Sequence, residues 1–402
     1  MGKVLLWAAS PLNENGAQTG ASKNGVTYKY NVDLAKQAAD ALAEALADVQ
    51  NGSTPYALAE YNYSNIYDHE AASGSSTNYS DIFRTTGQSW KMPGSTEAIL
   101  RGTQAEINGS NWNFAKTWGP KVNGLVEHDV IIHMPTANYV NYYGMANGLP
   151  LDDPDSGFDP THPFKDRDPR FYHDIMFDGF KFLNTTPGAD DAPYQYLQLY
   201  TGGNLRTDAT QGSKTGYFCQ KLVPHQCNKY DGMYNWGGAL QTYLPYMRLA
   251  DIYLLYAESC AAAGGANYKS SKCNLTGEDA VNVIRDRVGA GHVAVKYTAN
   301  QTLFMDEVRR ERAVELAFEG FRWNDLQRWL LLTEYPYNIK TSQEFRRVGD
   351  YDYVNNDPRD AEVTGWSEEV IVERAFDTKH YLLPLKEDDV YLYEGFGQNP
   401  GW

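Results

Sequence analysis

The sequence has 402 residues, enough for one large body with a sizeable core. Its 51 acidic residues outnumber its 35 basic residues, and the formal net charge of -16 repels phosphate backbones and anionic lipid headgroups, so nucleic acid is not expected as a partner. No stretch approaches the about 20 apolar residues of a membrane span, and the apolar run at residues 4–9 is too short for a secretory signal.

Residues 31–50 predict an amphipathic helix with Asn31 as N-cap, because apolar residues recur there at steps of three and four. Its many alanines permit close packing of a second helix. We assign residues 4–9 to that helix, which would end before Pro11, because proline disfavours helix in the residue that precedes it. Residues 1–58 are therefore expected to be the N-terminal part of a helical repeat scaffold.

Residues 59–245 lose this periodicity and are rich in Gly, Asn, Ser, Asp and Pro with scattered aromatic residues. Long loops in a compact protein usually carry function or are disordered. The aromatic residues argue against disorder. We expect this loop-rich segment to be the ligand-binding region.

Carbohydrate binding uses flat rings that stack on the C–H faces of sugars and amides that hydrogen-bond to hydroxyls. One part of the loop-rich segment offers both kinds of group. The predicted ligand-binding residues are Asn111, Trp112, Asn113 and Trp118, with Trp90 and Tyr139 as weaker candidates. Each of the two leading tryptophans could equally anchor its loop to the scaffold, and this alternative stays open.

The sequence offers no motif of an enzyme. It has no Gly-x-Ser-x-Gly elbow, no His-Glu-x-x-His helix and no phosphate-binding glycine loop, so no catalytic residue and no cofactor is predicted. A pair of glycosidase carboxylates would leave little local signature. Four aspartates between residues 152 and 159 could bind calcium, but their spacing breaks the EF-hand pattern, and a solvated turn is favoured over a metal site.

The cysteines allow two expectations. Cys219 and Cys227 flank a short polar loop, so we expect a disulfide between them in an oxidising compartment. Cys260 falls on an apolar helix stripe, which favours a buried thiol.

Regular helices return at Tyr246. The apolar spacing predicts a helix that ends at Gly264, and Thr276 begins a second one with a pattern close to a capping box. Two such helices within about 34 residues match the size of a tetratricopeptide unit. A third helix is expected over residues 302–319 and a short one over residues 325–332.

Two side-chain sets follow from these helices. We predict that Val314, Phe318 and Phe321 pack with Leu249, Ile252 and Tyr256 in a common core. Four charged residues at steps of three and four are expected to form a ladder along one side of the helix; they are Arg312, Glu315, Glu319 and Arg322. We expect them to fix the turn at Gly320 by pairing with Asp325 and Arg328. This reading is favoured over a docking surface.

Several runs of the sequence closely resemble the SusD/RagB family. They include Tyr246-Met-Arg-Leu-Ala-Asp-Ile-Tyr-Leu-Leu-Tyr-Ala-Glu258, the run Glu311 to Trp329, Tyr381-Leu-Leu-Pro384 and the ending Gln398-Asn-Pro-Gly-Trp402. Weaker likeness extends back through Phe164 to Phe171 and to Leu5 to Leu12. The resemblance covers essentially the whole chain.

The resemblance implies a mainly α fold in which a tetratricopeptide-like helical repeat scaffold carries a long, loop-rich, aromatic-bearing insertion. Residues 246–402 would be its C-terminal repeats and tail. It also implies a lipoprotein of the outer membrane and cell surface that binds a glycan and delivers it to a TonB-dependent, SusC-like transporter. Family members have a further N-terminal part with the signal and the lipidated cysteine, so we expect this sequence to be truncated.

The resemblance leaves the ligand open. A peptide or glycopeptide nutrient, or a role as a structural lid on the transporter with weak ligand affinity, is the alternative to glycan binding.

Overall fold

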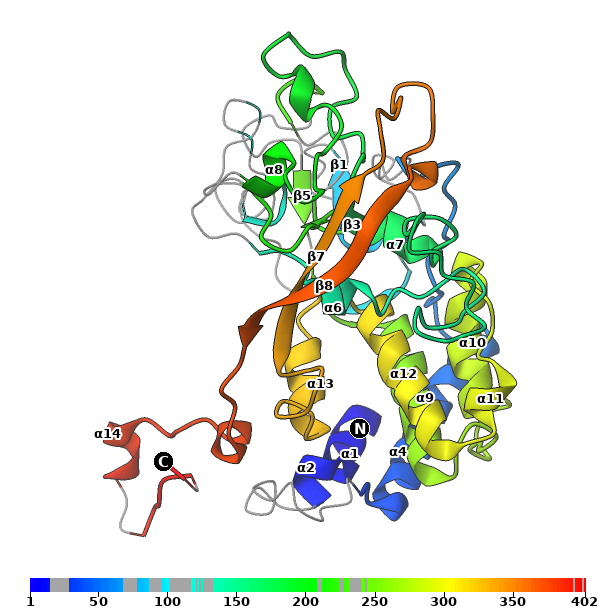
Figure 1. The fold of residues 1–402 in the computed structure, drawn as a ribbon. Coiled ribbons are helices and arrows are strands. Elements are labelled where there is room, and N and C mark those ends of the chain that lie inside the picture. Colours follow the sequence, from blue (N-terminus) through cyan, green and yellow to red (C-terminus); the bar gives the residue numbers. More distant parts are fainter. Residues whose placement is uncertain are drawn as a thin grey trace.

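The computed structural model describes residues 1–14, 29–67, 78–86, 96–101, 117–120, 122, 125, 133–207, 212–223, 228–231, 240–242, 244–392, 395–399 and 401–402. Figure 1 shows a bundle of helices that includes the N-terminal helix, and a loop-rich region with short strands on the opposite side. The fold is mainly α, as predicted.

The helical bundle is built around one buried helix. Its longer members are α1 (Gly2–Ala9), α4 (Val32–Gln50), α9 (Leu249–Ala263), α10 (Gly277–Val288) and α12 (Gln301–Glu315). Helix α9 is apolar on nearly every side and packs against α4, α10 and α12. A helix that is apolar all round has to be covered on all sides, which explains why α9 lies at the centre.

Most ends of these helices lie where the sequence places them, but α9 begins at Leu249 and not at Tyr246, because residues Pro245–Arg248 form the strand β6. The Asn31 side chain accepts a hydrogen bond from the backbone N–H of Leu34 at 3.0 Å and begins α4. Thr276 and Asp279 form a capping box at the start of α10. Helix α1 ends at Ala9, just before Ser10 and Pro11. The predicted tetratricopeptide-like pairing of α9 with α10 is therefore confirmed.

The predicted third helix is too long. Helix α12 ends at Glu315, and the chain then turns through Phe318 and Gly320, whose φ angles are 63° and 88°. A left-handed conformation stops a right-handed helix. Helix α13 (Arg322–Arg328) follows, so the short helix also lies earlier than predicted.

This turn changes where the side chains after Ala313 point. Val314 is buried in the core of the loop-rich region, and Phe318 packs against that core and not against α9. Phe321 does pack against the helical bundle that holds Leu249, Ile252 and Tyr256. The prediction of one common core is therefore wrong for Val314 and Phe318.

Short helices and strands make up the rest of the fold. The helices are α2 (Pro11–Glu14), η1 (Tyr79–Ile82), α6 (Ala137–Val140), α7 (Pro169–Asp174), η2 (Ala192–Tyr194), α8 (Asn204–Thr207), α11 (Val295–Thr298), η3 (Pro358–Asp360), η4 (Thr378–Tyr381) and α14 (Glu387–Val390). The strands are β1 (Arg84–Thr86), β2 (Ala98–Arg101), β3 (Ile175–Met176), β4 (Phe218–Cys219), β5 (Leu240–Thr242), β6 (Pro245–Arg248), β7 (Ile339–Arg347) and β8 (Val363–Glu373).

The strands pair antiparallel as β1 with β5, β2 with β6, β3 with β4 and β7 with β8. The β7–β8 ribbon is the longest of them and runs from the helical bundle toward the loop-rich region (Figure 1). Most of β7 is buried, whereas most of β8 is exposed. The ribbon thus carries its connecting loop, residues 348–362, to the loop-rich side of the molecule.

A cluster of buried charges joins the two regions. Glu315 at the end of α12 contacts Arg248 at 2.7 Å, Arg170 at 3.1 Å and Arg287 at 2.5 Å. Glu319 contacts Arg248 at 2.8 Å and also the buried Lys221. We call Glu315, Glu319 and their cationic partners the Glu315 cluster. It fastens α12 to α7, β6 and α10 at once.

The Glu315 cluster corrects the predicted charge ladder. Glu315 and Glu319 are buried and use partners that are far away in sequence, instead of the helical neighbours of an exposed ladder. Arg312 does contact Asp325 at 3.0 Å, and Arg328 contacts Asp325 at 2.8 Å, so the predicted pairing around Gly320 is confirmed for these residues. Arg322 lies over the Tyr142 ring at 4.8 Å.

Cys219 and Cys260 are both buried. Cys219 in β4 is a buried thiol. Cys227 lies outside the described residues, so the disulfide between the two stays a prediction. Burial raises the pKa of the Cys219 thiol to about 12, which keeps it protonated. Cys260 is a free, buried thiol, as predicted.

Candidate ligand-binding site

The predicted ligand-binding residues are described only in part. Trp90, Asn111, Trp112 and Asn113 lie outside the described residues, so their role stays a prediction. Trp118 and Tyr139 are described, and both contact Phe318.

Trp118 and Tyr139 are engaged inside the protein. The Trp118 ring stacks on His133 with centroids 4.8 Å apart and meets the Phe318 ring edge to face. The Tyr139 hydroxyl donates a hydrogen bond to the backbone oxygen of Ala313 at 2.6 Å. These contacts favour the alternative in which the rings anchor their loops, although both rings keep some exposed surface.

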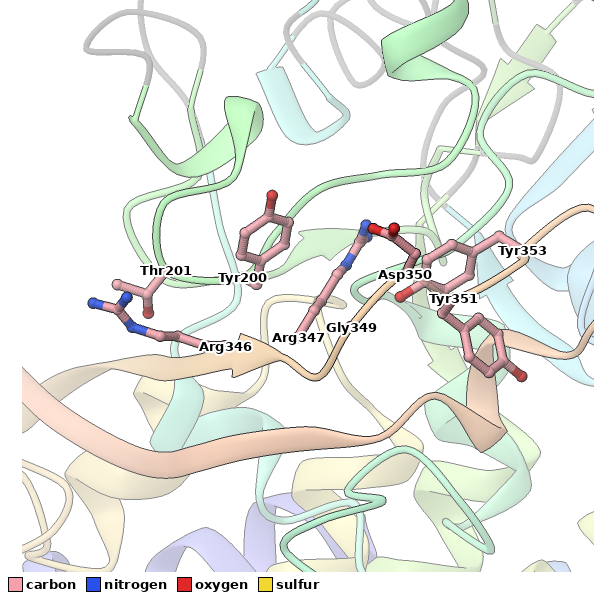
Figure 2. Close-up of a pocket in the computed structure, with 8 residues that line it drawn as sticks. All are labelled: Tyr200, Thr201, Arg346, Arg347, Gly349, Asp350, Tyr351 and Tyr353. Atoms are coloured by element: carbon pink, nitrogen blue, oxygen red, sulfur yellow. The ribbon is translucent and has the colours of Figure 1, made fainter.

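An open hollow lies where β7 ends, at some distance in sequence from the predicted residues. Its volume is about 410 Å³, within the range of about 300–1,000 Å³ that is usual for ligand pockets. Figure 2 shows that its lining comes from two segments, one around Tyr200 and one at the end of β7 and the loop after it. We call it the charged hollow; its lining residues are Tyr200, Thr201, Arg346, Arg347, Gly349, Asp350, Tyr351 and Tyr353.

A second hollow of about 270 Å³ shares Tyr353 with the first. Four asparagine side chains, at positions 65, 184, 355 and 356, belong to its lining. We call it the amide hollow; the other lining residues are Ile66, Tyr67, Lys181, Tyr196, Tyr353, Val354, Asp357, Pro358 and Arg359. Tyr353 therefore stands between a charged surface and an amide-rich surface.

Four of the five tyrosine rings of the two hollows form a group that we call the tyrosine ledge, made of Tyr196, Tyr200, Tyr351 and Tyr353. Tyr196 and Tyr353 stack with centroids 5.9 Å apart and an interplanar angle of 27°. Tyr351 approaches the Tyr353 ring at 4.8 Å. Burial and the nearby Asp178 carboxylate raise the pKa of the Tyr353 phenol, so it stays neutral.

An ion pair between the buried Asp178 and the half-buried Arg347 holds the ledge in place. Arg347 donates to the Asp178 carboxylate at 2.7 and 3.0 Å, and its guanidinium lies 4.7 Å from the Tyr200 ring and 4.5 Å from the Tyr353 ring. Asp178 also accepts hydrogen bonds from the backbone N–H groups of Leu199 and Tyr200. The pair thus fixes a ring on each side of the charged hollow before any ligand binds.

Gly179 sets the depth of the Tyr353 ring. Its φ angle is 79°, and a Cβ atom added there would meet Cε1 of Tyr353 at 2.3 Å. Only glycine gives room for this approach and adopts this conformation easily. The ring therefore rests directly on the backbone.

Sequence reasoning missed this site, although a signal was present. The run Asp350-Tyr-Asp-Tyr-Val-Asn-Asn356 alternates rings with carboxylates and amides, as the segment around Trp112 does. It lies beyond residue 245, outside the segment that was expected to bind ligand. The hollows also need Asn65, Asn184 and Tyr200, which only the fold brings near this loop.

A Ser–His–Asp arrangement elsewhere has the order of a catalytic triad. Ser80 Oγ lies 2.8 Å from His173 Nε2, and His173 Nδ1 lies 2.7 Å from Asp174 Oδ1. A triad serine must reach its substrate. All three residues are 0% exposed, so this arrangement serves packing in the core.

Two of the four aspartates that were considered for calcium contact a lysine side chain of the protein itself. Lys296 Nζ contacts Asp153 at 2.6 Å and Asp155 at 2.7 Å. Burial would raise the pKa of Asp153, but the hydrogen bonds from Lys296 and Tyr297 outweigh it and lower this pKa to about 2. The loop is thus tied to α11 by an ammonium group.

No described helix combines the length and the apolar character that crossing a membrane requires.

The fold occurs in solved structures. A SusD-like protein from Bacteroides fragilis NCTC 9343 is 20% identical with a TM-score of 0.61, and the match covers 95% of this chain and 67% of that one. A SusD homolog from Bacteroides thetaiotaomicron VPI-5482 is 17% identical with a TM-score of 0.52, covering 100% and 62%. A SusD-like carbohydrate binding protein from Bacteroides fragilis NCTC 9343 is 21% identical with a TM-score of 0.52, and the match covers 87% of this chain and 60% of that one.

This chain therefore spans about two thirds of the length of these relatives. Among the curated proteins none matches it. The model of the SusD family matches residues 96–402, which is most of the sequence. The chain belongs to the SusD family.

Proposed function

We propose that this protein binds a glycan at the surface of the cell and delivers it to a TonB-dependent, SusC-like transporter of the outer membrane. It acts by binding and has no catalytic step. Membership of the SusD family supports this class of function. One structural relative is a SusD-like carbohydrate binding protein, which agrees with this proposal.

The observation that carries the proposal is the tyrosine ledge between the two hollows. Tyr353 presents a ring at the border of both, and the charged and amide side chains around it can exchange hydrogen bonds with sugar hydroxyls. Rings with an apolar face and a polar rim suit the C–H faces of sugars. The Asp178–Arg347 pair fixes the rings in advance, which lowers the ordering cost of binding.

The location is part of the same proposal. A lipid anchor at the outer membrane would hold the protein at the cell surface, with the ledge facing the medium. Trp112 and Trp118 remain a second candidate for the ligand contact.

Calorimetry with a panel of soluble polysaccharides tests the proposal. Tyr353→Ala should weaken the binding of the glycan that the wild type binds by about tenfold or more, since about 1.4 kcal/mol of ring contact is lost. Tyr391→Ala is the matched control, because Tyr391 is 79% exposed and lies just after α14, far from β7 in Figure 1.

The outcomes separate the alternatives. Equal affinities of the wild type and Tyr353→Ala would remove the ledge as the site. No binding of any polysaccharide, together with capture of the protein by the transporter, would favour the structural lid.

A further inference from the structure

The charges around Tyr353 nearly balance. Arg347 is paired with Asp178 at 2.7 Å, and Arg359 is paired with Asp357. Lys181 has interactions of its own. Within the described part of the chain, the Arg346 guanidinium and the Asp350 carboxylate have no ion-pair partner, so one free cation and one free anion face the charged hollow.

An anionic ligand would gain little from this arrangement. Figure 2 shows Arg346 and Asp350 at opposite ends of the charged hollow, so a charged ligand long enough to span it would meet one charge of each sign, within a protein whose net charge is -16. Sugar hydroxyls, in contrast, both donate and accept hydrogen bonds, so they can use a guanidinium, a carboxylate and amides together.

The two hollows are also small when taken singly. The charged hollow lies at the low end of the usual range for ligand pockets, and the amide hollow lies just below it. Because they share Tyr353, a ligand that fills both must cross this ring and continue on either side.

Resting on the proposed function, we infer that the ligand is an uncharged glycan bound as an internal stretch of its chain. One sugar lies beside Tyr353 at the border of the two hollows, and its neighbours on the two sides occupy the charged hollow and the amide hollow. Recognition therefore depends on chain length and on neutrality, and it does not require a chain end.

Calorimetry with two matched sets of oligosaccharides tests this inference. The first set contains neutral α-glucan, β-glucan, β-mannan and β-galactan oligosaccharides from two to six sugars. The second set contains the same oligosaccharides with their primary hydroxyls oxidised to carboxylates. We expect affinity for a neutral series to rise about tenfold from the disaccharide to the tetrasaccharide and then to level off.

Charge has separate readouts. The oxidised series should bind about tenfold more weakly than its neutral counterpart. Raising the salt concentration should change the neutral affinity less than about twofold, because screening acts on charged partners. Asp350→Asn removes the anion of the charged hollow, so the difference in affinity between the neutral and the oxidised series should become smaller. Asn356→Ala should reduce the rise in affinity with oligosaccharide length and leave the difference between the two series unchanged.

Three results would overturn the inference. Tighter binding of the oxidised series would show that the ligand is acidic, and a disaccharide as strong as the tetrasaccharide would show that one hollow suffices. Both results would leave glycan binding itself intact. Binding of neither series, nor of any polysaccharide, would overturn the proposed function as well.

Discussion

The Glu315 cluster and the tyrosine ledge differ in where their charged side chains lie. In the cluster, two carboxylates are buried among arginines and a lysine, at distances of about 3 Å or less. On the ledge, one ion pair lies beneath the rings, and Arg346 and Asp350 line the open hollow. A buried charge that loses its partner is costly, whereas an exposed one can exchange water for a ligand. The cluster therefore determines the packing, and the ledge is free to bind.

Removing Arg248 gives the largest expected effect. Arg248→Met leaves Glu97, Glu315 and Glu319 short of a cation in a buried place, so the free energy of unfolding should fall by about 3–5 kcal/mol or more in a denaturant titration. Lys272→Met is the control, because its contact with Glu44 at 3.4 Å is exposed, and it should cost less than about 1 kcal/mol. Equal losses for the two variants would erase the contrast between buried and exposed charge.

Acid should weaken the scaffold through Glu311. Burial would raise the pKa of this carboxyl, but Arg170 and Arg285 outweigh it and lower the pKa to about 2 from an ordinary 4.5. The contribution to stability is complete above pH 4.5 and is lost as the pH falls toward 2, with a size of order 3 kcal/mol. Denaturant titrations at pH 7, 4.5 and 3 should show the free energy of unfolding fall with pH. In Glu311→Gln this free energy should depend less on pH. A wild type that is equally stable at pH 5 and pH 3 would contradict the assigned role of Glu311.

Trp118→Ala separates anchoring from ligand stacking. Because His133 and Phe318 contact the half-buried ring, we expect a loss of about 2 kcal/mol in stability with glycan affinity changed less than about twofold. Thermal melts and calorimetry on the same sample measure both. An unchanged melting temperature with lost affinity would restore Trp118 as a sugar platform.

Gly179→Ala should give the smallest change in stability and a clear change in binding. The left-handed conformation costs a Cβ residue roughly 1–2 kcal/mol, and the new methyl would displace the Tyr353 ring. Gly157→Ala pays the same conformational cost, because its φ angle is 73° and its surroundings are open. Affinity should fall only in Gly179→Ala; a fall in both variants would point to general loosening.

The helices could be read from the sequence because their signals are local. Asn31 and Thr276 cap the helices that they were expected to begin, and apolar spacing located α9. The end of α12 could not be read, because Phe318 adopts a left-handed conformation that its residue type does not announce. Glu315 fits an exposed ladder by spacing alone, and only the fold brings Arg248 and Arg170 to it.

The site was harder still. Tyr351 and Tyr353 stand in a recognisable sequence pattern. The position of the Tyr353 ring, however, depends on Asp178, Gly179 and Tyr200, which lie more than 150 residues earlier in the sequence. The periodicity of the sequence does not predict contacts between such distant residues.

Different residues support the rings of the ledge and form the loop after β7, which bears on how the protein can evolve. The rings are held from below by Asp178, Gly179 and Arg347, while the loop at Asp352 hydrogen-bonds mainly to its own residues, such as Asn355. Exchanges at Asp350, Asn355 or Asn356 would therefore alter what the hollows select without disturbing their support. Under the proposed function, proteins that share this scaffold can come to bind different ligands through a few substitutions at the tip of a single hairpin.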